Sequence, residues 1–143
     1  MAKKVALILG GNGGIGCAAT KRLIEDGMHV CATYNSNIDN IEKIKNISSK
    51  DDLSVYQCDV MKYDLITKMI EDIISNFRKI DVVIFSLTTS LKHTRLLELE
   101  WDNYLEHFNL QIKSIHFATK ALQEQILSKQ KIKFVILLTE ACL

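Results

Sequence analysis

The sequence predicts a doubly wound α/β fold, in which helices cover both faces of one parallel sheet. Short apolar runs alternate along the chain with longer stretches whose apolar residues recur every three or four positions. A cluster of glycines directly follows the first apolar run. Strands that alternate with helices of ten or more residues form βαβ units with right-handed crossovers, and 143 residues suffice for one such domain, here residues 1–143.

The first unit is a strand, a glycine turn and a helix. Residues 5–9 (VALIL) are apolar without alternation, which is typical of a strand buried on both faces of a parallel sheet. Five glycines then lie between Gly10 and Gly16. The next helix is predicted to end at Asp26-Gly27, because glycine suits the left-handed position after a helix. Its apolar residues stand four apart: Ile15, Ala19 and Leu23.

The later elements repeat this alternation. Four more strands are predicted, over residues 28–34, 53–58, 80–87 and 133–139. A polar, basic loop over 88–95 follows the fourth strand. Apolar periodicity predicts a second helix on Ile38, Ile41, Ile44 and Ile47, a third on Leu65, Met69, Ile73 and Phe77, and a long fourth helix over about 101–128 on Leu105, Phe108, Ile112, Ile115, Leu122 and Ile126.

Composition excludes several classes of function. Eighteen Lys and Arg against 17 Asp and Glu leave a net charge of +1, so we expect no nucleic-acid or membrane partner. The apolar runs are far shorter than a bilayer span, and we expect no signal peptide or membrane anchor. Four cysteines without a CxxC pair indicate free thiols and a cytoplasmic location. The four histidines lack ligand spacing, so no metal site is expected.

The glycine turn indicates dinucleotide binding. Glycines between a buried strand and its helix let backbone N–H groups approach a pyrophosphate, and the helix N-terminus adds partial positive charge. Residues 10–16 satisfy three registers at once, GxGxxG, GxxGxxG and GxxxGxG, and the cluster alone does not choose among them. A mononucleotide P-loop is disfavoured, because Cys17-Ala18 stand where that motif needs Lys and then Ser or Thr.

Four segments in order resemble the short-chain dehydrogenase/reductase family. Residues 9–16 (LGGNGGIG) resemble its TGxxxGIG turn, with Leu9 in place of the threonine. Asp59-Val60 resembles its adenine-contacting pair, residues 80–84 (IDVVI) resemble the strand before its NNAG motif, and Trp101-Asp102 opens the long helix as is usual there. The resemblance implies five parallel strands in the order 3-2-1-4-5. It covers the amino-terminal half to two-thirds of a family member, so the domain would be incomplete.

The resemblance also implies the cofactor site. Gly10, Gly14 and Gly16 would cradle the pyrophosphate, and Asp59 and Val60 would bound the adenine. The full set implied to contact the cofactor is Gly10, Asn12, Gly13, Gly14, Ile15, Gly16, Tyr34, Asn35, Ser36, Asp59, Val60 and Ser86.

The choice between NADP and NAD depends on the end of the second strand. A carboxylate there would bind the ribose 2′-hydroxyl of NAD and repel the 2′-phosphate of NADP. The chain has Tyr34-Asn35-Ser36, which resembles NADP-preferring members, although no arginine is present to hold the phosphate. NADP is therefore the expected cofactor, with NAD possible; an ordinary strand-to-helix turn capped by Ser36 or Asn37 is the alternative interpretation.

The family's catalytic YxxxK pair is absent from these 143 residues. The residues four positions after the tyrosines are not lysine: Tyr34, Tyr56, Tyr63 and Tyr104 are followed by Ile38, Val60, Thr67 and Phe108. By resemblance the catalytic serine falls on Thr139, and the helix asparagine of the proton relay falls on Gln111, with Asn109 the nearest alternative. NNAG is replaced by residues 85–88 (FSLT).

Two functions therefore stand. The resemblance implies an NAD(P)-dependent oxidoreductase that reduces a carbonyl or oxidises an alcohol by hydride transfer, with this chain as its dinucleotide-binding part. The alternative is a non-catalytic NADP-binding or truncated module. We also expect a homo-oligomer or self-association, because residues 134–138 form an apolar strand without proline or charge at the expected edge of the sheet.

Overall fold

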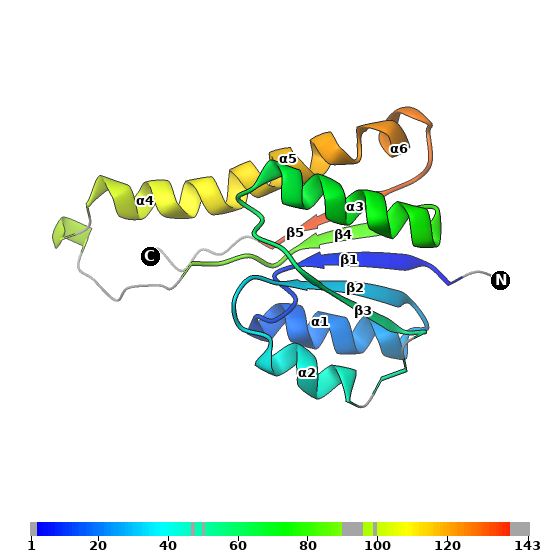
Figure 1. Ribbon diagram of the computed structural model, residues 1–143. Coiled ribbons are helices and arrows are strands. Elements are labelled where there is room, and N and C mark those ends of the chain that lie inside the picture. The colour runs from blue at the N-terminus through cyan, green and yellow to red at the C-terminus, as the bar shows by residue number, and fades with distance from the viewer. Residues whose placement is uncertain (1–2, 47, 50, 90–95, 99, 138–143) are drawn as a thin grey trace.

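The computed structural model describes residues 3–46, 48–49, 51–89, 96–98 and 100–137. Five parallel strands form one sheet in the order β3-β2-β1-β4-β5, which confirms the predicted fold class (Figure 1). The strands are β1 (Val5–Leu9), β2 (His29–Tyr34), β3 (Leu53–Gln57), β4 (Val82–Phe85) and β5 (Lys133–Ile136).

Helices cover both faces of this sheet (Figure 1). One face packs against α1 (Gly14–Glu25) and α2 (Asp39–Lys45), and the other against α3 (Tyr63–Phe77) and part of a second group of helices, which precedes β5. A short 3₁₀ turn, η1 (Leu96–Glu98), leads into that second group, which comprises α4 (Trp101–Phe108), the π-helical turn η2 (Asn109–Lys113), α5 (Ser114–Ala121) and α6 (Gln123–Leu127).

The core lies on both sides of the central strand. All five residues of β1 are buried, as the apolar run predicts, and their side chains alternate between the two core clusters. On the α3 side the buried residues are Ile66, Met69, Ile70 and Ile73. The predicted stripe was therefore wrong at Leu65, which is 41% exposed, and the neighbouring Ile66 takes that place. On the α1 side, Ile41 and Ile44 of α2 are buried as predicted.

The long fourth helix differs from the prediction. It is interrupted by η2 and again at Leu122, where φ and ψ of −89° and 6° end the regular helix. Its predicted apolar stripe divides in two: Leu122 is buried, whereas Phe108 is 62% exposed and Ile112 is 51% exposed. For Phe108 the reason is position, because α4 projects beyond the carboxyl ends of the strands and has no sheet beneath it (Figure 1).

Candidate functional site

The glycine turn connects the carboxyl end of β1 to α1. Gly10 has φ +86°, and a Cβ there would overlap the carbonyl oxygen of Ser86. A Cβ on Gly16 would overlap the carbonyl oxygen of Gly10. The turn is closed by a hydrogen bond from Gly13 N–H to Gly10 O at 3.1 Å, and Thr33 Oγ1 accepts one from Gly10 N–H at 3.0 Å. Gly10 and Gly16 are thus required by packing within the protein.

Gly14 is different, because nothing in the described chain lies within 4 Å of a Cβ placed there. It is the first residue of α1, whose N-cap, Gly13, provides no side-chain hydrogen bond. The first turn of α1 contains no acidic residue. Among the described residues, the N–H groups of Gly14, Ile15 and Gly16 have no hydrogen-bond acceptor, since the first bond is from Cys17 N–H to Gly13 O. This helix N-terminus is free to hold an anion.

Ile15 lies on the open side of this turn. The sequence assigned it both to the apolar stripe of α1 and to the cofactor site, and its side chain is 66% exposed. Thr20 is buried in the helix instead, with its hydroxyl donating to Gly16 O at 2.8 Å. Ile15 therefore does not support the core, and an apolar side chain is left beside the open N-terminus of α1.

Asn12 faces the neighbouring helix. Its Oδ1 accepts hydrogen bonds from the backbone N–H groups of Asn40 (3.0 Å) and Ile41 (3.1 Å) in the first turn of α2. The sequence assigned Asn12 to cofactor contact without indicating these partners, because α2 begins 27 residues later and only the fold brings the two segments together.

The segment after β2 is polar and open to solvent. Asn35 and Ser36 are exposed, and Tyr34 is half-buried against the α2 side of the core. The carbonyl oxygen of Asn35 accepts a hydrogen bond from Gln57 Nε2 at 3.1 Å. The first carboxylate after β2 is Asp39, which lies in the first turn of α2. The end of β2 itself thus carries no acidic side chain.

Asp59 and Val60 follow β3 at the same edge of the sheet. Asp59 Oδ1 accepts a hydrogen bond from Met61 N–H at 3.0 Å, and its Oδ2 lies 3.7 Å from Lys62 Nζ. These contacts fix the turn into α3. Val60 is buried. The preceding Cys58 stays protonated, because burial and the nearby Asp59 charge raise the pKa of its thiol to about 11.

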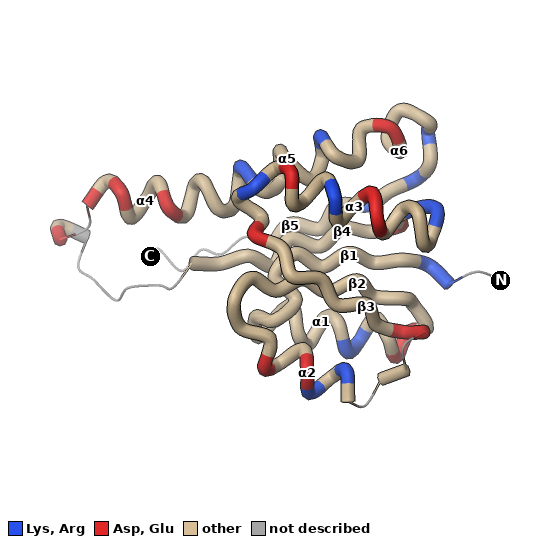
Figure 2. Tube along the Cα trace, viewed as in Figure 1, with Lys and Arg blue, Asp and Glu red and all other residues tan. Residues whose placement is uncertain are grey.

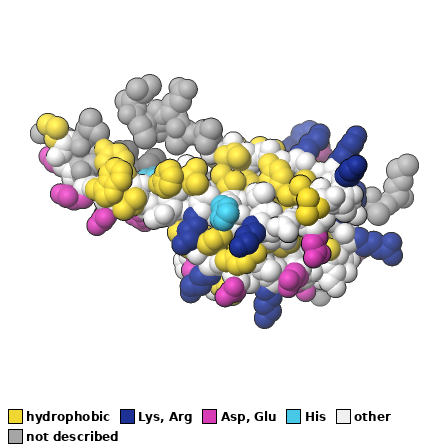
Figure 3. Space-filling view, turned by 90° about the horizontal axis from the view of Figure 1, so that it is seen from above, with side chains coloured by type: hydrophobic (Ala, Val, Ile, Leu, Met, Phe, Trp, Pro, Cys, Tyr) yellow, Lys and Arg dark blue, Asp and Glu magenta, His cyan; other side chains and the backbone are white. Residues whose placement is uncertain are grey.

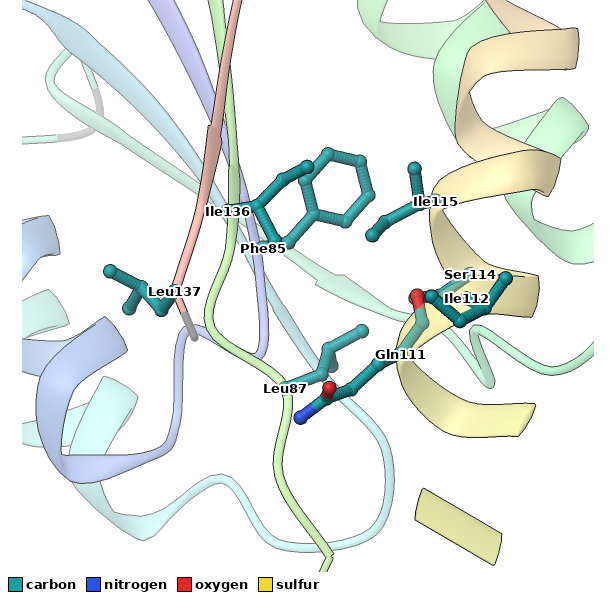
Figure 4. A pocket seen from close by; sticks show the side chains of 8 residues that line it. All are labelled: Phe85, Leu87, Gln111, Ile112, Ser114, Ile115, Ile136 and Leu137. Carbon is teal, nitrogen blue, oxygen red and sulfur yellow. The ribbon is translucent and has the colours of Figure 1, made fainter. Parts of the chain in front are cut away.

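A small cavity lies between the carboxyl ends of β4 and β5 and the π-helical turn (Figure 4). Its volume is about 30 Å³, enough for a water molecule. Gln111 lies in η2, and its side chain points toward Leu87 (Figure 4). The buried Ser114 donates its hydroxyl to Gln111 O at 3.0 Å. The cavity is lined by Phe85, Leu87, Gln111, Ile112, Ser114, Ile115, Ile136 and Leu137.

The π-helical turn gives Gln111 a special backbone setting. Single π turns inside α-helices recur at functional sites, since they displace one residue out of the regular helical register. Asn109, the alternative to Gln111, is exposed at the start of the same turn. Ser86, after β4, donates its N–H to Leu9 O at 2.9 Å and so extends the pairing of β4 with the carboxyl end of β1. Thr139, the remaining candidate, lies outside the described residues.

The described residues contain no group of three His, Cys, Asp or Glu side chains placed to hold a metal ion. No helix among them is long and apolar enough to cross a membrane.

Comparison with known proteins agrees with this geometry. The family described as enoyl-(acyl carrier protein) reductase matches residues 10–141. The NADP-dependent mannitol dehydrogenase of Alternaria alternata is 37% identical over 86 residues, which are 57% of this chain and 32% of that protein. The 3-oxoacyl-(acyl-carrier-protein) reductase FabG of Staphylococcus epidermidis is 31% identical over 107 residues, 72% of this chain and 44% of that protein.

Solved structures show the same arrangement. The structure titled "ElxO with NADP Bound" superposes with a TM-score of 0.81 and 25% identity, over 94% of this chain and 54% of that one. A 3-oxoacyl-reductase from Bacillus thuringiensis, described there as putative, has a TM-score of 0.81 at 24% identity and shows the fold alone. The chain spans about half or less of the length of these relatives.

Proposed function

Since the chain belongs to the enoyl-(acyl carrier protein) reductase group of the short-chain dehydrogenase/reductase family, we propose that residues 1–143 are a dinucleotide-binding unit that binds NADP(H) through the N-terminus of α1. The main support for this proposal is the environment of Gly14. No packing within the described chain requires glycine there, and the N–H groups beside it have no acceptor. A pyrophosphate is the ligand chemistry that uses both features.

Cofactor choice follows from the segment after β2. NADP is favoured over NAD because the end of β2 lacks the carboxylate that binds a ribose 2′-hydroxyl. The names of two relatives support this choice, since one is an NADP-dependent dehydrogenase and the other holds NADP. Asn35 and Ser36 supply exposed amide and hydroxyl donors in the same place.

The proposed reaction is carbonyl reduction or the reverse alcohol oxidation. NADP(H), when bound, supplies or accepts the hydride. Gln111 lies at the π-helical turn beside the cavity, which supports its proposed role in ordering a proton relay. Thr139 is the proposed hydroxyl for orienting a substrate oxygen, on the sequence resemblance alone. The names of two relatives, a mannitol dehydrogenase and a 3-oxoacyl reductase, support an alcohol or carbonyl substrate for this chain.

Isothermal titration calorimetry of the folded chain with NADPH and NADH tests this proposal. We expect saturable binding of both, with the smaller dissociation constant for NADPH. Failure to bind either ligand, in a chain that shows a cooperative unfolding transition, would contradict dinucleotide binding. Equal or tighter binding of NADH would contradict the choice of NADP alone.

We further propose that two copies of this chain associate through α4. Hydrophobic side chains gather over this helix on the face seen in Figure 3. Trp101, Tyr104 and Phe108 are 71%, 44% and 62% exposed, and their spacing of three and four residues places them along one side of the helix. Burying this row against a second copy removes an apolar surface that a monomer leaves in water.

Charge favours an antiparallel arrangement of the two copies. Residues 101–121 comprise α4, η2 and α5. The acidic residues Asp102 and Glu106 lie in the first half of this segment, and the basic residues Lys113 and Lys120 lie in the second (Figure 2). A twofold axis would place each acidic half against the partner's basic half. Sedimentation analysis should show a dimer that Phe108→Glu dissociates and that Leu127→Glu, at another exposed apolar position, leaves intact. A monomeric unmodified chain would contradict this interface.

We place the protein in the cytoplasm. Cys17, Cys31 and Cys58 are free thiols, which suits a reducing compartment. Burial raises the pKa of the Cys31 thiol to about 12, so this group stays protonated and is not a nucleophile.

A further inference from the structure

Asn12 links the glycine turn to the segment after β2. Besides the two bonds that its Oδ1 accepts from Asn40 and Ile41, its Nδ2 donates to Asn37 Oδ1 at 3.2 Å. In return, the Asn40 side chain donates to the carbonyl oxygen of Asn12 at 3.0 Å. One side chain of the turn thus uses both its acceptor and its donor on the β2–α2 connection.

These bonds close the N-terminus of α2. Asn37 Oδ1 also accepts a hydrogen bond from Asp39 N–H at 2.8 Å. The first three N–H groups of α2 are therefore bonded to two asparagine oxygens, although the N-cap residue, Ile38, has no side chain that could cap the helix. Two acidic residues in the first turn, Asp39 and Glu42, further disfavour an anion there.

The N-terminus of α2, whose first N–H groups are hydrogen-bonded, contrasts with that of α1. Both helices begin at the carboxyl edge of the sheet (Figure 1), yet of these two only α1 has N–H groups without an acceptor among the described residues. A second phosphate on the adenosine ribose therefore has no helix N-terminus available at α2. It depends instead on the exposed residues 35–37.

Residues 35–37 are hydrogen-bonded to the rest of the protein at the Asn35 carbonyl and the Asn37 side chain. Gln57 Nε2 bonds to the carbonyl oxygen of Asn35, and Asn12 Nδ2 bonds to the side chain of Asn37. Within the described residues, the side chains of Asn35 and Ser36 have no hydrogen-bond partner. The end of β2 is where the adenosine ribose of a dinucleotide lies in this fold class.

Building on the proposed function, we propose that Asn12 and Asn37 form a clamp that fixes residues 35–37 against the glycine turn and thereby sets the preference for NADPH over NADH. Asn12 is a positioning residue, since it acts on the 2′-phosphate through Asn37 rather than by touching it. A segment that is already ordered loses less conformational entropy when a ligand binds to it. Only NADPH gains from this, because only NADPH has the 2′-phosphate that binds to residues 35–37.

The test compares dissociation constants of NADPH and NADH, by calorimetry, for the unmodified chain, Asn12→Ala and Asn37→Ala. Asn76→Ala is the matched control, because it removes an amide that donates to Asp72 O and Oδ2 on α3. We expect the ratio of the NADH constant to the NADPH constant to fall about fivefold in both clamp variants, the factor for one net hydrogen bond, and to stay unchanged in the control. Thermal unfolding of each variant is measured in parallel.

The outcomes separate the possibilities. A clamp variant with a lowered unfolding temperature but an unchanged ratio would show a purely structural role and overturn the clamp. If Asn12→Ala does not fold, Asn37→Ala decides, because it leaves both bonds from Asn12 Oδ1 to α2 in place. An unmodified chain that binds both ligands without preference contradicts the clamp and the choice of NADP but leaves dinucleotide binding in place, whereas one that binds neither contradicts dinucleotide binding and the clamp with it.

Discussion

Replacing Gly14 with valine should weaken cofactor binding without lowering the stability of the fold. No atom of the described residues lies within 4 Å of a Cβ at this position, so we expect the new side chain to fit without a steric clash in the free protein. Glycine is also a poor helix former, and valine at the start of α1 should leave the free energy of unfolding within about 0.5 kcal/mol of the unmodified chain. The folded state should therefore survive the change.

The Gly14→Val substitution should weaken the binding of NADPH strongly. A valine side chain would occupy the space through which a pyrophosphate reaches the N–H groups of Ile15 and Gly16. Losing two hydrogen bonds to a charged ligand, at about 1.5 kcal/mol each, weakens binding by about 3 kcal/mol, or about a hundredfold. Calorimetry with NADPH measures this loss, and urea unfolding of the same sample measures stability.

Gly16→Ala is the opposite control. Its Cβ would overlap the carbonyl oxygen of Gly10, so we expect a loss of about 3 kcal/mol of stability, as for an overpacked core. A folded Gly14→Val chain that binds NADPH as tightly as the unmodified chain would refute the placement of the pyrophosphate at α1.

Three further predictions concern the edge strand, an ion pair and turnover. Ile136→Lys on β5, whose residues are exposed at one edge of the described sheet, should reduce light scattering without changing the circular dichroism; an unmodified chain free of aggregates would contradict this. Burial opposes ionisation of Asp81, but hydrogen bonds from Lys79 and Val5 outweigh it and lower its pKa. Asp81→Asn should therefore be less stable than the unmodified chain at neutral pH, and the difference should vanish as pH falls through that lowered pKa; a pH-independent difference in urea unfolding would argue against this. Lacking YxxxK, the 143-residue chain should show no NADPH-dependent carbonyl reduction, and substrate-dependent oxidation of NADPH would disprove it.

The sequence predicts the centre of the sheet well because β1 is apolar on both faces. The run over residues 5–9 is typical of a strand buried in a parallel sheet, and the glycines after it predict where the turn lies. The resemblance to short-chain dehydrogenases/reductases is confirmed by the family match, and the strand order that it implied agrees with the structure.

Helix faces are predicted less well, because periodicity locates an apolar stripe but not the surface that covers it. Ile15 and Leu65 continue their stripes in sequence, yet both are exposed, and the buried residue is in each case the next one along the helix, Gly16 or Ile66. Phe108 belongs to a regular stripe on a helix that extends past the sheet. The π-helical turn at Gln111 has no signature in residue spacing.

The side-chain partners of the site depend on tertiary contacts. Thr33 appears in the sequence as one residue of a buried strand, and its bond to Gly10 follows only from the parallel pairing of β1 and β2. The bonds from Asn12 to α2 depend on the same pairing, because it brings the two turns together at one edge of the sheet. Sequence spacing alone contains no information on either contact.

Amide chemical-shift changes on adding NADPH test most directly whether the dinucleotide binds at the N-terminus of α1. The free N–H groups at the start of α1 should respond most strongly, so the amide resonances of Gly14, Ile15 and Gly16 should move on titration. The N–H groups of Asn40 and Ile41 already bond to Asn12, and their resonances should move much less. Shifts largest at the start of α2, or none at the start of α1, would contradict the account.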